Sequence, residues 1–569
     1  IYTHYSGASN LLGDNPISVA NKTNITKDRL GIGAETDSYH ENLINWIRGQ
    51  DVLDTDEDGS TTDSRNQLAD PLHSSPYLVT YGGTESDPDI SVFYGDNEGV
   101  FHAVNASTGV EHFAFIPDEL LPNLDKLYRN TGESNHPYGL DGQIAAWIKD
   151  VNANSIIETA DNDHVYLYMG MRRGGRNYYA LNVTNRNSPR MLWTINGGSG
   201  DFVKMGQTWA RPIKTKINVG GTITDVLIIS GGYDDDQDSA NVRTADDIGN
   251  AMYIVNASTG ALIWSASNQA SYDLNLTDMQ YSIPSTVRAI DVDADGVTDQ
   301  FYVGDMGGQL WRFDVHNGSA VANLVTAGVI ADLGGATAAN TRRFYHEPDI
   351  SVLVKDNQRK LAIAIGSGFQ AHPLNVATED RFYLVLQNSL TSAPADTDSD
   401  GHPDYVKLTH SDLFDTTNNI IENGTDTQQE DSAESLSAAQ GWFIDLFGEY
   451  KNTTGPGEKT LARALTLNGV LYFTTYQPDV IASASCTATD TAVRKLYSIN
   501  LIDATPTVVG TDTADRWGSS TLMGSGIPSA PVHVRITDDD GTSDLVGVGT
   551  EFTKASSGDI VTKTFWYSF

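Results

Sequence analysis

The stretch Asp299-Gln-Phe-Tyr-Val-Gly304, closely followed by Gln309-Leu-Trp-Arg-Phe-Asp-Val-His-Asn-Gly318, decides the fold class of this chain. Aromatic and β-branched residues in short runs favour strands, and Asn-Gly steps are typical of turns. The same unit, a turn or acidic residue followed by a short apolar run, recurs along the sequence. Its seven copies are Asp89-ISVFYG, Asp163-HVYLYMG, Asp225-VLIISG, Asp299-QFYVG, Lys360-LAIAIG, Asn468-GVLYFT and Asp544-LVGVG.

Most copies precede a second strand pattern, as in Val100-FHAVNASTG, Asn177-YYALNVTN and Asn250-AMYIVNASTG. Seven strand–turn–strand units favour a β-propeller, in which radial repetition leaves only short, protected sheet edges. A pair of β-sandwiches would show similar alternation and is the alternative. We therefore predict an all-β, seven-bladed propeller with long loop insertions and a few short helices. Helical patterns are confined to residues 41–48, 118–128 and 435–443.

Two segments interrupt the repeat. Residues 1–88 precede the first unit and are expected to be a lead-in segment packed on or joined to a propeller of residues 89–569. Residues 391–460 are rich in Asp, Thr, Asn, Gln and Ser, which predicts an inserted loop or subdomain. The sequence begins Ile1-Tyr2-Thr3, so we expect an excised or mature part of a longer protein.

Composition excludes several functions. The 569 residues carry 36 Lys and Arg against 74 Asp and Glu, a formal net charge of −38. Such a chain is a poor partner for nucleic acid or an anionic membrane, and the acids favour cation binding. The single cysteine, Cys486, excludes an internal disulfide and any zinc or iron–sulfur site built from several cysteines.

One aspartate loop, Asp291-Val-Asp-Ala-Asp-Gly-Val-Thr-Asp299, has the pattern of a calcium site. Carboxylates at positions 1, 3 and 5 converge in a tight loop, and glycine at position 6 permits the turn. A helix–loop–helix calcium site ends with a Glu at position 12 of its loop, but here position 12 is Tyr302. We therefore expect the oxygen shell to close at position 9, where a strand begins. The predicted Ca²⁺ ligands are Asp291, Asp293, Asp295, the backbone carbonyl of Val297, and Asp299.

Three other segments repeat this pattern less completely. The segment 396–404 predicts a second metal loop, with Asp396, Asp398, Asp400, the backbone carbonyl of His402, and Asp404 as ligands. Weaker candidates are Asp54, Asp56 and Asp58, where Thr62 occupies position 9 and Asp63 falls one residue late, and Asp150, Asn152, Asn154 and Glu158. Amides in place of carboxylates lower the expected affinity, and a plain structural turn is an equal alternative there.

Catalytic motifs are not found. The sequence has no His-Glu-x-x-His, no Gly-x-x-x-x-Gly-Lys and no Gly-x-Ser-x-Gly, so we expect a protein that is not an enzyme. One local cluster of positive charge stands out, Arg172-Arg-Gly-Gly-Arg176. It could bind a carboxylate-bearing partner, although pairing with aspartates of this acidic chain is the favoured interpretation.

Several motifs in order resemble a known family. They are Ile47-RGQD, Leu72-HSSPYLV, Gly95-DNEGVFHAVNASTG, Gly170-MRRGGRNYYALNV, Gly206-QTWARPIKTKI, Ala289-IDVDADGVTDQFYVGDMGGQLWRFDV and Ile365-GSGFQAHPLN. Together they resemble the C-terminal domain of the PilY/PilC family of type IV pilus biogenesis and tip adhesin proteins.

The resemblance implies a modified seven-bladed β-propeller on the bacterial cell surface at the pilus tip, associated with the outer membrane. It implies minor pilins as partners and a surface ligand of unknown identity. It also implies Ca²⁺ in the loop 291–299, with effects on pilus extension versus retraction, twitching motility and attachment. Some members carry an Arg-Gly-Asp triplet for integrins, but this chain has Arg48-Gly49-Gln50.

Two other functions compete. Ala257-Ser-Thr-Gly-Ala-Leu-Ile-Trp264 resembles repeats of quinone-dependent (PQQ) dehydrogenase propellers. Those enzymes usually have a vicinal disulfide, which a single cysteine cannot form. The other is a generic integrin-like adhesin in which calcium loops only add rigidity.

Overall fold

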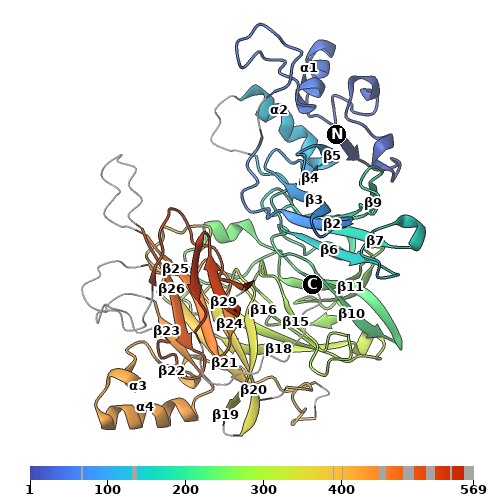
Figure 1. Ribbon diagram of the computed structural model, residues 1–569. Coiled ribbons are helices and arrows are strands. Elements are labelled where there is room, and N and C mark those ends of the chain that lie inside the picture. Colours follow the sequence, from blue (N-terminus) through green and yellow to red (C-terminus); the bar gives the residue numbers. More distant parts are fainter. Residues whose placement is uncertain are drawn as a thin grey trace. The chain divides into compact units, whose positions relative to one another are not determined.

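The structure of the chain is a computed structural model that describes residues 1–65, 68–130, 137–355, 357–388, 390–399, 402–446, 457–478, 492–507, 520–538 and 541–556 (Figure 1). The chain divides into two compact units. The first comprises Ile1–Lys214, Val226–Gly232 and Val255–Leu262, and the second comprises Thr215–Asp225, Tyr233–Ile254 and Ile263–Phe569.

Strands form seven separate sheets in the described residues. Each of the seven sequence repeats lies in a different sheet, and in each it forms an inner strand that pairs with neighbours on both sides. Two β-sandwiches would contain four sheets, so this alternative is wrong. The first three sheets have the orders β1 (Tyr2–His4), β5 (Glu111–Pro117), β4 (Phe101–Asn105), β3 (Asp87–Gly95), β2 (Tyr77–Thr84); β6 (Ile144–Lys149), β7 (His164–Gly170), β8 (Tyr178–Asn182), β9 (Arg190–Ile195); and β10 (Ile213–Val219), β11 (Thr222–Ser230), β12 (Ala251–Asn256), β13 (Leu262–Ser267), β14 (Leu274–Asn275).

The remaining four sheets lie in the second unit. Short strands that pair in parallel extend three of the seven sheets at an edge, as β1 does on β5. The four sheets have the orders β15 (Arg288–Ile290), β16 (Gln300–Gly304), β17 (Gln309–Val315), β18 (Val325–Asp332); β19 (Asp349–Lys355), β20 (Gln358–Gly366), β21 (Arg381–Gln387), β23 (Gly441–Asp445), β22 (Phe414–Asp415); β24 (Leu465–Leu467), β25 (Val470–Gln477), β26 (Val493–Asn500), β27 (Ser520–Thr521); and β28 (Val532–Asp538), β29 (Gly541–Val548), β30 (Glu551–Lys554).

The helices are short, as predicted. The α-helices are α1 (Asp37–Ile47), α2 (Leu121–Arg129), α3 (Ile420–Asn423) and α4 (Asp426–Ala438). Single 3-10 turns occupy Leu12–Asp14, Val19–Asn21, Asp118–Leu120, Thr159–Asp161, Gly200–Phe202, Asp235–Asp238, Val321–Asn323 and His410–Asp412.

The helix predicted at residues 435–443 is misplaced. Helix α4 begins earlier, where Thr425 and Gln428 form a reciprocal capping box, and it ends at Ala438. The apolar residues Gly441-Trp-Phe443 belong to strand β23, which pairs with β21. Long-range sheet pairing therefore decides the state of a segment whose local pattern is ambiguous.

The sheet that carries the main aspartate loop is rigid at its centre. Every residue of β16 is buried, which explains its unbroken apolar pattern. Phe301 stacks on Phe313 of β17 with ring centroids 4.5 Å apart, and both rings are fully buried. Burying a phenylalanine contributes about 2–3 kcal/mol, so the strand that follows the loop is firmly held.

The first unit contains a partly buried charge cluster around His102 of β4, in which Asp96 is buried and Glu111 of β5 is exposed. His102 lies 3.1 Å from Asp96 through Nε2 and 2.6 Å from Glu111 through Nδ1. Burial alone lowers the pKa of His102, but the two carboxylates outweigh it and raise the pKa to about 9.

Candidate metal centres

The main candidate site is the loop 291–299, which joins β15 to β16 in an antiparallel hairpin. The carboxylates of Asp291, Asp293 and Asp295 each offer an oxygen within 4.8 Å of the others. Asp293 and Asp295 are exposed, and Asp291 is half-buried. Three carboxylates this close repel one another unless a cation or protons neutralise them.

Backbone N–H groups hold the loop in shape. Both carboxylate oxygens of Asp291 accept such bonds, from Ala294 at 2.7 Å and from Gly296 at 2.8 Å. Asp293 accepts from the Asp295 N–H at 3.2 Å. Gly296 has a φ of 91°, which favours glycine, as the sequence pattern requires.

The C-terminal end of the loop is anchored in the sheet. Asp299 Oδ2 accepts the Val292 N–H at 2.7 Å, and the backbone of Asp299 bonds to Ile290 and Val315. Burial raises the pKa of Asp299, and the carboxylates of the loop raise it further. The loop therefore has a fixed half, whose closing carboxylate is half-buried, and an exposed half that carries three acids. The three clustered carboxylates could therefore hold a metal ion.

The loop 396–404 makes the same contacts where it is described. Asp404 Oδ2 accepts from the Thr397 N–H at 2.7 Å and from the Thr397 hydroxyl. Asp396 accepts from the Ser399 N–H at 2.7 Å, and Ser399 has a φ of 64°. Asp396, Asp398 and Asp404 form an acidic group within 4.8 Å. The predicted ligand Asp400 lies outside the described residues, and His402 follows directly after this gap.

In the weak candidate at 150–158, a carboxylate outside the predicted ligand set, that of Asp163, hydrogen-bonds back to the loop. Asp150 accepts from the Ser155 N–H at 2.7 Å, and Asn152 accepts from the Asn154 N–H at 3.1 Å, as in the main loop. Asp163, 13 residues after Asp150, accepts the Val151 N–H at 2.8 Å and the Glu158 N–H at 2.9 Å.

Asp163 thus occupies the place that Asp299 has in the main loop, directly before a strand of the repeat. Its backbone hydrogen bonds lower its pKa. The available clue was its position, since both Asp163 and Asp299 begin a copy of the seven-fold repeat. The sequence pattern places the last ligand at position 9 of the loop, which is Glu158 when counted from Asp150. Asp163 lies 13 residues after Asp150, so the pattern did not include it.

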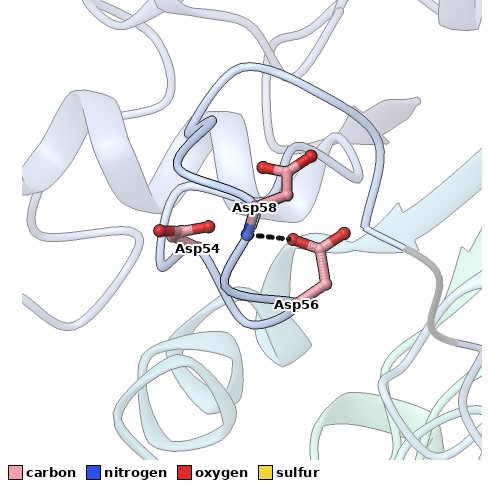
Figure 2. A group of neighbouring side chains, drawn as sticks. All are labelled: Asp54, Asp56 and Asp58. Atoms are coloured by element: carbon pink, nitrogen blue, oxygen red, sulfur yellow. Dashed lines mark hydrogen bonds between the residues drawn. The ribbon is translucent and has the colours of Figure 1, made fainter.

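The fourth loop lies in the first unit, after helix α1. Figure 2 shows the side chains of Asp54, Asp56 and Asp58 projecting from one turn, with the Asp58 N–H directed at Asp56 Oδ1. One carboxylate oxygen of each lies within 4.8 Å of the others. Gly59 donates to Asp54 at 3.1 Å. The sequence pattern correctly predicted that these three carboxylates lie together.

The arginine cluster is engaged by the protein itself. Arg172 lies 3.9 Å from Asp141 and over the ring of Trp209, at 4.3 Å from its centroid. Arg176 donates to the carbonyl of Met205 at 2.5 Å. The favoured interpretation, pairing with an aspartate, is therefore correct for Arg172.

Two further observations concern the described residues. No helix among them combines the length and apolar character needed to span a membrane. Cys486 lies outside the described part of the chain.

Comparison with known proteins identifies relatives of this chain. It is 27% identical over 304 residues to a type IV pilus biogenesis factor, PilY1, of Pseudomonas aeruginosa, covering 49% of this chain and 23% of the relative. It is 25% identical over 430 residues to a PilY1 homolog of Xylella fastidiosa, covering 69% of this chain and 25% of that protein. The matched region thus spans about a quarter of the length of these relatives.

A solved structure supports the fold. The crystal structure of the Pseudomonas aeruginosa PilY1 C-terminal domain matches with a TM-score of 0.53 at 17% identity, covering 82% of this chain and 93% of that one. The predicted β-propeller with few short helices is therefore confirmed. The family is one of pilus biogenesis factors rather than enzymes. The sequence profile of the PilY1 beta-propeller domain matches residues 59–380, which is more than half of this chain. The chain therefore belongs to the PilY1 β-propeller family.

Proposed function

We propose that this chain is the calcium-binding propeller of a type IV pilus biogenesis factor and tip adhesin at the bacterial cell surface. Its curated relatives are named as type IV pilus biogenesis factors. The observation that carries the calcium assignment is the loop 291–299, in which three carboxylates lie within 4.8 Å of one another at the start of a buried strand.

Calcium acts on this loop by removing repulsion. Without a cation, the exposed half of the loop carries three mutually repelling acids, while the half that ends at Asp299 is fixed to the sheet. A bound Ca²⁺ draws the three carboxylates and the Val297 carbonyl together with Asp299, so the loop becomes one rigid unit. The ligands come from the loop itself, so the site orders a surface rather than binding a substrate. The loop 396–404 provides a second site of the same kind.

An ordered loop surface gives calcium control over a partner. We infer that the partners are minor pilins at the pilus tip, and that the calcium-bound state favours pilus extension over retraction. Twitching motility and surface attachment then follow from the number of extended pili. The net charge of −38 makes a direct contact with an anionic membrane unfavourable, which agrees with a role at the pilus tip.

The test is made in a piliated strain that encodes the complete protein. Asp293→Asn in the chromosomal copy should lower the amount of surface pili and the twitching zone, and removing the retraction motor should restore the pili. Glu430→Gln, on the exposed face of α4, is the matched control because it also removes one carboxylate from the second unit. Normal piliation by an Asp293→Asn protein that no longer binds Ca²⁺ at this loop would contradict the proposal.

A further inference from the structure

The second unit contains a cavity of about 420 Å³, lined by the 3-10 turn Asp235–Asp238 with the residues after it and by the loop 367–380, which joins β20 to β21. Small-molecule sites typically measure about 300–1,000 Å³ and combine an apolar surface with a few polar groups. This cavity has both kinds of lining. Its polar residues are Asp238, Ser239, Asn241, His372 and Asn375.

The apolar lining of the cavity centres on Phe369 and is completed by Ala371, Pro373 and Leu374. Phe369 is 2% exposed, and its ring meets that of His372 at 78°, with the two centroids 5.0 Å apart. Leu374, in contrast, is 71% exposed. The apolar lining therefore extends from the buried core to the protein surface, where a ligand can reach it.

Two buried cations hold the walls of the cavity in place. Lys459 is fully buried, and its ammonium donates to the backbone carbonyls of Pro373 at 2.9 Å and Asn375 at 2.7 Å. Arg343 is also buried and donates to the carbonyl of Ala240 at 2.6 Å. One cation thus fixes the loop 367–380, and the other fixes the residues that follow the turn. A preformed site loses less conformational entropy when a ligand binds.

His372 joins the two walls directly. Its Nε2 lies 2.6 Å from the carbonyl oxygen of Asp238, which can only accept, so Nε2 carries the proton and Nδ1 of the neutral ring is an acceptor. The Asp238 side chain is oriented by the Tyr233 hydroxyl, which donates to Oδ1 at 2.6 Å. A carboxylate accepts several hydrogen bonds, so Asp238 can bind a ligand hydroxyl while Tyr233 keeps it in position.

The charges around the cavity favour a neutral ligand. The lining has one carboxylate, that of Asp238, and no lysine or arginine, so an anion would be repelled. A cation is disfavoured too, because the Arg343 guanidinium lies 3.9 Å from the centroid of the Phe369 ring and the Lys459 ammonium contacts the backbone of the same loop. A hydrocarbon would take water from the polar lining without replacing its hydrogen bonds. The ligand that remains is neutral, with an apolar face and several hydroxyl groups.

We propose that this cavity binds a neutral sugar, as the terminal unit of a surface glycan. A sugar ring has an apolar C–H face for the lining around Phe369, hydroxyls that donate to Asp238 and oxygens that accept from Asn241. The site gives the tip adhesin proposed above a ligand, and in this respect it rests on that function. In the described part of the chain, none of the residues that line the cavity belongs to an aspartate loop. Sugar binding should therefore persist without calcium.

The test is ligand-observed NMR with the purified complete chain in EDTA. The probes are glucose, galactose, mannose, N-acetylglucosamine and N-acetylgalactosamine, each at about 10 mM, which mostly fills a site with a Kd of about 1 mM. At least one of them should receive saturation transfer from the protein. Cationic glucosamine and anionic N-acetylneuraminic acid are the comparisons, and both should bind at least tenfold more weakly than the best neutral sugar.

Two variants locate the binding at this cavity. Ser239→Trp puts an indole into the lining from an exposed position and should abolish the signal. Asp238→Asn keeps an oxygen for the Tyr233 hydroxyl and should weaken binding at least fivefold. Asp235→Asn is the matched control, because Asp235 is an exposed acid of the same turn outside the lining, and it should bind like the wild type.

No saturation transfer to any of the neutral sugars, tighter binding of a charged sugar, or equal binding by the wild type and Ser239→Trp would overturn the proposal. The piliation of Asp293→Asn strains does not enter this measurement. Failure of sugar binding is therefore distinguishable from failure of the calcium-dependent function proposed above.

Discussion

Replacing Asp293 by Asn should stabilise the calcium-free protein and destabilise the calcium-loaded protein. The three carboxylates of the loop lie within 4.8 Å of one another, so each pair repels by about 0.9 kcal/mol or more in a water-like dielectric. Asp293→Asn removes two of the three pairs and should stabilise the calcium-free protein by about 1.7 kcal/mol. The amide oxygen can still accept the Asp295 N–H, so the turn itself should persist.

Calcium changes the sign of the difference in unfolding free energy between Asp293→Asn and the wild type. For a Kd of about 10 μM, 1 mM Ca²⁺ stabilises the wild type by about 2.7 kcal/mol. If the variant binds about a hundredfold more weakly, it gains only about 0.4 kcal/mol at the same concentration. Asp293→Asn should then be more stable than the wild type in chelator and less stable in calcium, by about 0.6 kcal/mol.

The assay is urea unfolding followed by tryptophan fluorescence, in EDTA and in 1 mM Ca²⁺. Other calcium loops contribute equally to both proteins and cancel in the comparison. Glu430→Gln serves as the control and should show the same difference from the wild type under both conditions. If Asp293→Asn also differs from the wild type by a constant amount, Asp293 is not a ligand and our reasoning about this loop is wrong.

Three further predictions concern other parts of the chain. Because His102 has its pKa raised to about 9, its two carboxylate contacts stabilise the fold below pH 6.5, and up to about 3 kcal/mol should be lost as pH rises through 9. Thermal unfolding of His102→Gln should lack this loss, and equal pH dependence of the two proteins would refute it. Phe301→Ala should cost about 3–5 kcal/mol in chemical unfolding, because its ring is fully buried against Phe313, and a loss below 1 kcal/mol would show that the stack is not important. Gly296→Ala meets no atom within 4 Å but keeps a φ of 91°, so it should cost only about 1–2 kcal/mol and weaken calcium binding modestly, as calorimetry can check; abolished binding would contradict this.

The sequence predicted the strands well because their pattern is strongly local. All seven repeats form strands in separate sheets, since each run of apolar residues is short, is bounded by turn residues and is buried. The error at residues 435–443 arose where an apolar run suits either a helix or a strand. There the pairing of β23 with β21, residues far apart in sequence, decided the outcome.

For the aspartate loops too, the sequence predicts one part of the arrangement and only the tertiary structure decides the other. Carboxylates at alternate positions of a tight turn must converge, so the sequence alone determined the clusters at 54–58 and 291–295. It could not identify Asp163 as the carboxylate that hydrogen-bonds back to the loop 150–158, because Asp163 follows that loop by a longer connection than the one that leads to Asp299. Only the tertiary structure decides such placements, since a hydrogen bond to the second residue of the loop depends on where the chain returns in space and not on how many residues it takes to return.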